Sequence, residues 1–379
     1  MLSAPHRMSP PGASPMYVEL STGTLTVEMQ SVDPAMRDTL RFAARENPRR
    51  GFLFVSTVIG RYMPAQPERL HQACTLLAEH LPVDLPGPVL CLGVAEAGVA
   101  LALGVHRTYR ARRGLDDVYV WHSSRLRLPI EPVARFVEAH SHAPAHALYT
   151  TTESPLWSAL PEIKSVVIID DEVTTGDTLM GVWRALAPLL PKCSTVKALA
   201  LSDWSRQRDG GVQVSTLAQG RFDFEPRRLA PEPQMPDVVG GRREVRCAMA
   251  RHGGRLGMQH VAAPIDLEAL GLRVRSGERV LVVGAGEHQG RAIRLAEAVD
   301  TAGGTGWFQF TTRAPVRLEG PIRSVFTTTD AYGEGIRDHL YNFEADRWDA
   351  VWVCHESNDA EACRPLLDAT GGRWVPEVS

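Results

Sequence analysis

The sequence predicts an α/β fold, with a mostly parallel sheet followed by a second, smaller α/β unit. Short apolar runs alternate with amphipathic helical patterns, as they do in doubly wound sheets. One such run, residues 166–169, is directly followed by Asp170 and Asp171, at the strand end where open α/β sheets bind ligands. The length of 379 residues exceeds the usual size of one hydrophobic core, so we expect two domains.

The N-terminal elements are expected to form the border of the sheet. Alternating apolar residues predict a hairpin or edge strands within residues 17–30. Asp33 is a plausible N-cap before proline, which predicts a helix over residues 34–46. A strand is expected at residues 51–58 and an amphipathic helix at residues 68–80.

The central elements alternate strand, turn and helix. Strands are expected at residues 89–92, 118–121, 166–169 and 196–201, with helices beginning at Gly98 and covering residues 179–190. This order is that of a parallel sheet with helices on both faces.

A segment rich in proline and glycine divides the chain. Residues 226–241 contain four prolines and end in Gly240-Gly241, which indicates an interdomain linker. We therefore expect a disordered tail (1–16), a first domain (17–225), a linker (226–243) and a second domain (244–379). Strands of the second, Rossmann-like domain are expected at residues 280–283, 307–310 and 351–354, with a helix at residues 291–299.

Composition narrows the class of protein. A net charge of −3 provides no general attraction to nucleic acid or anionic lipid, so neither is expected as a partner. The six cysteines are scattered, as is typical of reduced thiols in a cytoplasmic protein. The first sixteen residues lack an apolar signal-peptide core. Residues 88–105 contain Glu96 and three glycines, which makes them a poor membrane span.

The residues after the strand at 166–169 carry the clearest chemical signal. Two adjacent carboxylates can bind a diol. The loop that follows has small residues and hydroxyls before a helix, so its N–H groups can surround an anion; it consists of Thr174, Thr175, Gly176, Asp177 and Thr178. Together they suit a phosphorylated sugar. The simpler interpretation is an ordinary buried strand with an acidic end.

This arrangement resembles the phosphoribosyl pyrophosphate (PRPP) motif of type I phosphoribosyltransferases. The resemblance implies that Asp170 and Asp171 hold the ribose 2- and 3-hydroxyls, and that residues 174–178 wrap the 5-phosphate. Two positions depart from the family. Glu172 stands where an apolar residue is usual, and Thr174 where purine-type members often have Asp. The second departure favours an orotate-like branch, or a base that needs no deprotonation.

The resemblance also implies a pyrophosphate loop and a cationic cover. The loop would be the strand–helix turn made of Gly93, Val94, Ala95, Glu96, Ala97 and Gly98. Arg125 and Arg61 are candidates for the cation that neutralises the leaving pyrophosphate, although each is also compatible with a solvated surface arginine. His140 and His142 fall where the family has its mobile loop, and a substrate role is expected; the alternative is a structural pair.

Further stretches resemble the orotate-type phosphoribosyltransferases of bacterial tellurite-resistance (Ter) gene clusters. They are residues 47–56, 60–64, 140–143 and 170–172, and in the C-terminal half residues 284–287, 311–315, 330–335 and 340–342 resemble the TRSP domain of those proteins. Ala314 departs from the name-giving motif, which has Ser there. The resemblance implies an N-terminal hood over a type I phosphoribosyltransferase-like sheet, a homodimer, and a pathway making a nucleotide-like metabolite.

The two halves also resemble each other weakly. Residues 92–96 align with residues 283–287, and residues 122–125 with residues 310–313. One hypothesis is that the C-terminal half is a copy of the first that has lost its PRPP motif. The other is that any two α/β domains share glycine turns. Gly284, Gly286, Glu287 and Arg313 are therefore candidates for a second site.

The sequence thus predicts a cytoplasmic, Mg²⁺-dependent phosphoribosyltransferase that uses PRPP and a small base-like acceptor. Asp170 and Asp171 would be the metal-binding carboxylates, since Mg²⁺ prefers oxygen ligands. Two alternatives stay open: a phosphorylase-like or hydrolytic enzyme acting on a nucleotide in the reverse direction, and a non-catalytic PRPP-sensing regulator.

Overall fold

The computed structural model describes residues 12, 14–45, 50–137, 145–205, 212–227, 253–260, 263–357 and 359–377. Most of the expected tail and of the expected linker lie outside these residues, as do His140 and His142.

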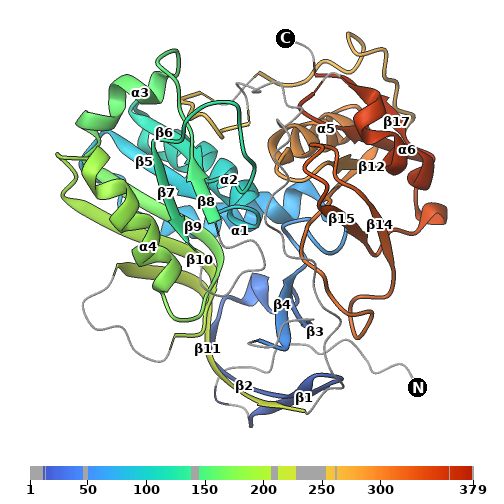
Figure 1. Ribbon diagram of the computed structural model, residues 1–379, viewed down its shortest axis with the longest axis horizontal. Helices are drawn as coiled ribbons and strands as arrows, with labels where there is room; N and C mark the ends of the chain where they lie inside the picture. The colour runs from blue at the N-terminus through green and yellow to red at the C-terminus, as the bar shows by residue number, and fades with distance from the viewer. Residues whose placement is uncertain are drawn as a thin grey trace.

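A seven-stranded sheet forms the N-terminal half (Figure 1). Its order is β1-β2-β11-β10-β9-β5-β6. The strands are β1 (Met16–Leu20), β2 (Gly23–Val32), β5 (Val89–Gly93), β6 (Val118–His122), β9 (Ser165–Val173), β10 (Thr195–Asp203) and β11 (Gln213–Pro226). The five strands from β11 to β6 are parallel, whereas β1 and β2 add an antiparallel border. The α/β fold with a mostly parallel sheet is confirmed.

Helices cover both faces of this sheet. The larger hydrophobic core joins α1 (Pro67–Glu79) and α2 (Gly98–Arg113) to one set of alternate strand residues, including Cys91 and Ile169. The opposite set, including Leu92 and Ile168, packs against α3 (Pro155–Ala159) and α4 (Asp177–Leu186). Successive strand residues point to opposite faces. Burial on both faces therefore explains why these strands are continuously apolar.

The predicted helix at residues 34–46 is wrong. Asp33 does act as a cap and accepts a hydrogen bond from Ala35 N (2.8 Å), but only a 3₁₀ turn, Pro34–Met36, follows. The chain then forms β3 (Leu40–Ala44), which pairs antiparallel with β4 (Phe52–Ser56). In this hairpin Phe54 stacks on Trp204 with ring centroids 4.3 Å apart. Burial of these aromatic rings outweighs the local helical signal.

The C-terminal half contains a four-stranded parallel sheet of order β13-β12-β16-β17. Its strands are β12 (Arg279–Gly284), β13 (Thr305–Phe310), β16 (Ala350–Cys354) and β17 (Arg373–Val375), and its helices are α5 (Gln289–Thr301) and α6 (Arg364–Thr370). Two antiparallel hairpins were not foreseen: β14 (Val325–Thr329) with β15 (Arg337–Tyr341), and, in the first half, β7 (Ala134–Val137) with β8 (Ala145–Leu148). None of the helices in the described ranges is long and apolar enough to cross a bilayer.

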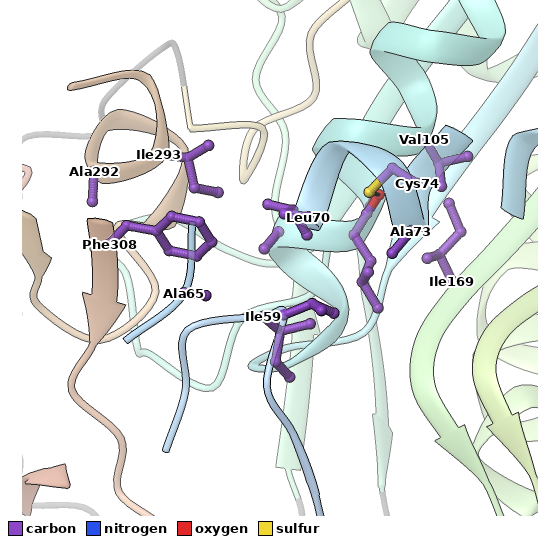
Figure 2. Packing of buried hydrophobic residues seen from close by; sticks show 14 of the residues in the cluster. Ile59, Ala65, Leu70, Ala73, Cys74, Val105, Ile169, Ala292, Ile293 and Phe308 are labelled. Carbon is purple, nitrogen blue, oxygen red and sulfur yellow. Dashed lines mark hydrogen bonds between the residues drawn. The ribbon is translucent and has the colours of Figure 1, made fainter. Parts of the chain in front are cut away.

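The two halves share one hydrophobic core. Figure 2 shows Phe308 of β13 between Ile293 of α5 and Ala65 and Leu70 of the first half. An antiparallel bridge joins the backbones of Ala65 and Phe308. The second half is therefore packed directly onto the first, close to the carboxyl ends of its strands.

Candidate functional site

A crevice opens at the carboxyl ends of β5, β6 and β9, with about 1010 Å³ of empty space that is partly open to solvent. The turn after β5, the last residues of β9 with the loop that follows, and the β3–β4 hairpin supply most of its lining. Arg313 and Ala314 of the second half complete it. This is the end of the sheet at which α/β proteins bind ligands.

Asp170 and Asp171 both line the crevice. Asp171 N donates to Asp170 Oδ1 (2.9 Å). Desolvation, together with the neighbouring Glu172 carboxylate, raises the pKa of Asp171 to about 6, although Arg61 opposes the shift. Carboxylates crowded in this way favour the approach of a cation or of hydroxyl donors.

The carboxylate of Glu172 is paired with the guanidinium group of Arg50. Both carboxylate oxygens accept from Arg50, at 2.7 and 3.0 Å. The Arg50 guanidinium in turn lies 4.8 Å from the centroid of the Phe52 ring, at the start of β4. This pair ties the end of β9 to the β3–β4 hairpin, and so holds the hairpin beside the crevice.

The loop at residues 174–178 leads directly into α4. Gly176 has φ 87°, a left-handed conformation that glycine adopts without strain. Asp177 N donates to Thr175 Oγ1 (3.3 Å), and this hydroxyl donates to Asp177 Oδ2 (2.9 Å). Thr174, Thr175, Gly176 and Thr178 line the crevice, whereas Asp177 is not among its lining residues. The crevice is thus bordered by hydroxyls and by the N-terminus of a helix.

The turn after β5 lies opposite. Val94, Ala95, Glu96 and Ala97 line the crevice, while Gly93 and Gly98 are not among its lining residues. Two amides of this turn donate within the protein, Val94 N to Ile169 O (2.9 Å) and Ala95 N to Ser123 Oγ (2.9 Å). These bonds fix the turn against β9 and β6.

Glu96 is buried and links the two halves. It accepts from Thr312 Oγ1 (2.6 Å) and lies 3.1 Å from Arg61 Nη2. Burial by itself would raise the pKa of Glu96, but Arg61 and Arg125 outweigh it and hold the pKa below its usual value. Glu96 is therefore an ionised anchor that sets the position of Arg61.

Five arginines line the crevice: Arg45, Arg50, Arg61, Arg125 and Arg313. Arg61 and Arg125 were candidates from the sequence, and Arg313 was assigned to a second site. Arg45 and Arg50 were missed. They lie between β3 and β4, and the helix expected at residues 34–46 gave no sign of this hairpin. So many guanidinium groups beside two aspartates suit a ligand that combines several negative charges with a diol.

The residues expected at a second site are engaged by the protein itself. Glu287 accepts from Ser124 Oγ (2.6 Å) and from Arg125 N (2.7 Å). The hydroxyl of Tyr332 donates to Ala285 O (3.2 Å), and its ring lies so close to Gly286 that a Cβ there would be 2.9 Å from it. Gly284 packs behind this turn, against His288 and Phe310.

The described residues contain no cluster of three or more histidine, cysteine or acidic side chains that could hold a metal ion. All five cysteines in the described ranges are free thiols. Burial raises the pKa of Cys74 and of Cys91 to about 12, which makes them structural rather than reactive.

Two family models match this chain. Residues 39–220 match the family described as "Phosphoribosyl transferase", and residues 249–370 match "TRSP domain C terminus to PRTase_2". No curated protein matches.

Solved structures give weaker likenesses. A purine phosphoribosyltransferase from Pyrococcus horikoshii is 19% identical, with 39% of this chain and 83% of that chain covered and a TM-score of 0.25. An adenine phosphoribosyltransferase from Rhodothermus marinus is 17% identical, with 48% and 96% covered and a TM-score of 0.32. Strand order and direction, rather than these likenesses, establish the fold.

Proposed function

We propose that this enzyme transfers phosphoribose from PRPP to a base-like acceptor and releases pyrophosphate. The proposal is supported by the match of residues 39–220 to the phosphoribosyl transferase family and of residues 249–370 to the TRSP domain. One observation carries the proposal. The aspartate pair, the threonine-rich loop and the arginines of the sequence prediction border a single crevice at the ligand-binding end of the sheet.

Each part of PRPP has a matching group in the crevice. Asp170 and Asp171 bind the ribose hydroxyls, and residues 174–178 bind the 5-phosphate at the start of α4. Within the turn at residues 93–98, residues 94–97 line the crevice and border the pyrophosphate, whose charge Arg61 and Arg125 offset. His140 and His142, which lie between β7 and β8 in the sequence and outside the described residues, are proposed to contact the substrate.

The carboxylates fit Mg²⁺. Asp170 and Asp171 offer hard oxygen donors at the crevice, the ligand type that Mg²⁺ prefers. When bound, Mg²⁺ supplies positive charge to the pyrophosphate oxygens.

The side chains of this crevice act by orientation and electrostatics. Bond cleavage at the anomeric carbon builds negative charge on the leaving pyrophosphate and positive charge on the ribose ring. Arg61 and Arg125 offset the first, and the carboxylates of Asp170 and Asp171 lie beside the second. Because Glu96 and Thr312 already hold Arg61, little reorganisation is needed.

The acceptor and the setting are proposed from the resemblance to the Ter-cluster enzymes. We propose an orotate-like branch, because Thr174 stands where a base-handling aspartate would be, and a pathway for a nucleotide-like metabolite linked to tellurite or stress resistance. A cytoplasmic homodimer that binds neither nucleic acid nor membrane is proposed on the same basis and on the near-neutral charge.

An Asp171→Asn variant tests the ribose assignment. Loss of a carboxylate facing the diol and the metal should lower kcat/KM for PRPP by about a hundredfold or more. The assay is pyrophosphate release with PRPP, Mg²⁺ and a panel of bases. Asp349→Asn is the control, because that aspartate lies on the second half and pairs with Arg279 instead. Equal activity of Asp171→Asn and the control would refute the assignment.

This assay, combined with a test for base release from nucleotides and with calorimetry, separates the alternatives. A reverse-direction enzyme would release base from a nucleotide without producing pyrophosphate from PRPP. A PRPP-sensing regulator would bind PRPP in calorimetry and turn over none of the bases.

A further inference from the structure

The two parallel sheets have the same arrangement. In the first half, β5 lies between β6 and β9, with β10 beyond β9. In the second, β12 lies between β13 and β16, with β17 beyond β16. Both β5 and β12 end in glycine and lead through a short turn into a helix, α2 or α5. Shared strand order by itself is common among α/β domains.

The hydrogen bonds within the turns also match. Three bonds of the first half have counterparts in the second. Val94 N donates to Ile169 O (2.9 Å) as Ala285 N donates to Cys354 O (3.2 Å), and Ser123 N donates to Gly93 O (3.0 Å) as Thr311 N donates to Gly284 O (3.1 Å). Ala95 N donates to Ser123 Oγ (2.9 Å) as Gly286 N donates to Thr311 Oγ1 (2.8 Å). The last pair uses a side-chain hydroxyl, which the fold itself does not demand.

Contacts between the halves are reciprocal. Ser124 of the first half donates to Glu287 of the second, and Thr312 of the second donates to Glu96 of the first, both at 2.6 Å. The edge strands are covered in the same way: Val120 of β6 bridges to Met258, and Phe308 of β13 bridges to Ala65. Two like units related by a twofold axis make contacts of this kind, in which residue i meets j and j meets i.

A Gly-Arg pair completes the correspondence. Gly60 and Gly254 both have positive φ, 71° and 82°. Their carbonyls accept from the ends of the opposite edge strands, Gly60 O from Phe310 N (2.8 Å) and Gly254 O from His122 N (3.3 Å). Arg61 then lies 3.1 Å from Glu96, and Arg255 lies 3.1 Å from Glu287.

The halves differ after the matched residues Ile169 of β9 and Cys354 of β16. In the first half Ile169 is followed by Asp170 and Asp171, which face the crevice. The matching Cys354 is followed by His355 and Glu356, which are buried. Arg255 donates to both oxygens of Glu356, at 2.7 and 2.5 Å, and the ring of Tyr332 lies 4.4 Å from that of His355. Protein groups thus fill the space that the crevice occupies in the first half.

We propose that residues 253–377 are a second copy of the phosphoribosyltransferase core. Arg255 closes the crevice of this copy, and its Arg313 completes the crevice of the first half. The alternative, that glycine turns alone make the halves alike, does not account for the exchanged Ser124–Glu287 and Thr312–Glu96 bonds or for the two Gly-Arg pairs. The role of Arg313 rests on the proposed function.

Arg313 is placed to bind an anion. It follows Thr312 as Arg125 follows Ser124, and both arginines line the same crevice. Its Nη1 pairs with Glu334 (2.7 Å), and its side chain is only 9% exposed. Its buried Nη2 lies 3.8 Å from Asp330 Oδ1 and has no hydrogen-bond partner among the described residues. A buried guanidinium N–H at a crevice wall is matched by a phosphate oxygen.

Calorimetric titration of the full-length protein with PRPP and Mg²⁺, without acceptor, tests the proposal. Wild type should bind one PRPP per chain. Arg313→Gln should raise the dissociation constant about tenfold or more, through loss of a buried charged donor. Arg279→Gln is the matched control, an arginine of the same half whose partner Asp349 is remote from the crevice, and it should bind PRPP as wild type does. If Arg313→Gln does not fold, Arg313→Lys keeps the charge and should weaken binding less.

The outcomes are distinct. Two PRPP molecules per chain, or unchanged affinity in a folded Arg313 variant, would overturn this inference while leaving the proposed function intact. Absence of PRPP binding by wild type would instead refute the proposed function.

Discussion

At the scale of single residues, Asp338 is a buried carboxyl of the second half that interacts electrostatically with Arg313. It is 2% exposed and accepts a hydrogen bond from Thr311 Oγ1 (3.0 Å). Burial raises its pKa to about 7, with Arg313 opposing and Glu96 adding to the shift. The carboxyl is therefore protonated below neutral pH, behind the arginine that faces the crevice.

Replacement of Asp338 by Asn should flatten the dependence of stability on pH. The folded-state pKa lies above the ordinary value of 3.8, so the stability due to this carboxyl is present below about pH 4 and lost as pH rises through 7. Relative to wild type, Asp338→Asn should gain about 3 kcal/mol between pH 5 and pH 8, because two pH units below the folded-state pKa count at about 1.4 kcal/mol each. Urea unfolding at both pH values measures this difference. If Asp338→Asn and wild type show the same dependence of stability on pH, the Asp338 carboxyl is already ionised at pH 5 in the folded protein.

At the scale of elements, the turn between β5 and α2 determines how near the helix approaches β9. A Cβ at Gly98 would lie 2.4 Å from Ile169 O and 3.3 Å from the Asp170 Cα. Both neighbours are backbone atoms, so they cannot move without displacing the strand that carries the aspartate pair. Glycine is therefore required here for close packing rather than for an unusual φ.

Gly98→Ala should lower the free energy of unfolding by about 1–3 kcal/mol, because β9 must shift to admit the methyl group. The same shift should weaken PRPP binding. Gly181→Ala in α4 is the control: its nearest neighbour is 3.8 Å away, so alanine should be neutral or stabilise by about 0.4–1 kcal/mol. Thermal unfolding and PRPP titration of both variants provide the comparison. Equal stability of the two would mean that the turn relaxes without cost.

At the scale of the whole molecule, one core crosses the boundary between the halves. It includes Leu70 and Val105 of the first half and Phe308 and Ile293 of the second (Figure 2). Buried polar contacts extend it: Gln289 accepts from Ala100 N (3.1 Å) and donates to Glu96 O (2.9 Å). Interfaces of this kind couple the unfolding of the units that they join.

Calorimetry should therefore show one unfolding transition for both halves. Phe308→Ala should move that single transition to lower temperature and reduce the free energy of unfolding by about 3–5 kcal/mol, since the ring is fully buried between the halves. Trp157→Ala, at a side chain that is 43% exposed, serves as the control and should change the midpoint little. Two separate transitions in wild type would contradict the shared core.

Much of this molecule follows from local sequence. The strands at residues 89–92, 118–121, 166–169 and 196–201 were placed correctly, because burial on both faces leaves a continuous apolar run that needs no knowledge of the partner strands. The border strands, the helix at residues 68–80 and the main elements of the second half were also foreseen. The aspartate pair and its loop could be expected to lie together because both belong to one contiguous segment.

Only the tertiary structure decided the rest. The segment at residues 40–44 is a strand because Phe42 is buried against Phe54 of the neighbouring strand, a contact that the sequence of the segment itself does not indicate. Arg313, more than a hundred residues from Asp171, lines the same crevice because the second half packs against the first. The sequence determined which groups meet within one strand and its turn. Contacts between distant segments depend on how two cores bury their surfaces against each other, and no local pattern encodes that.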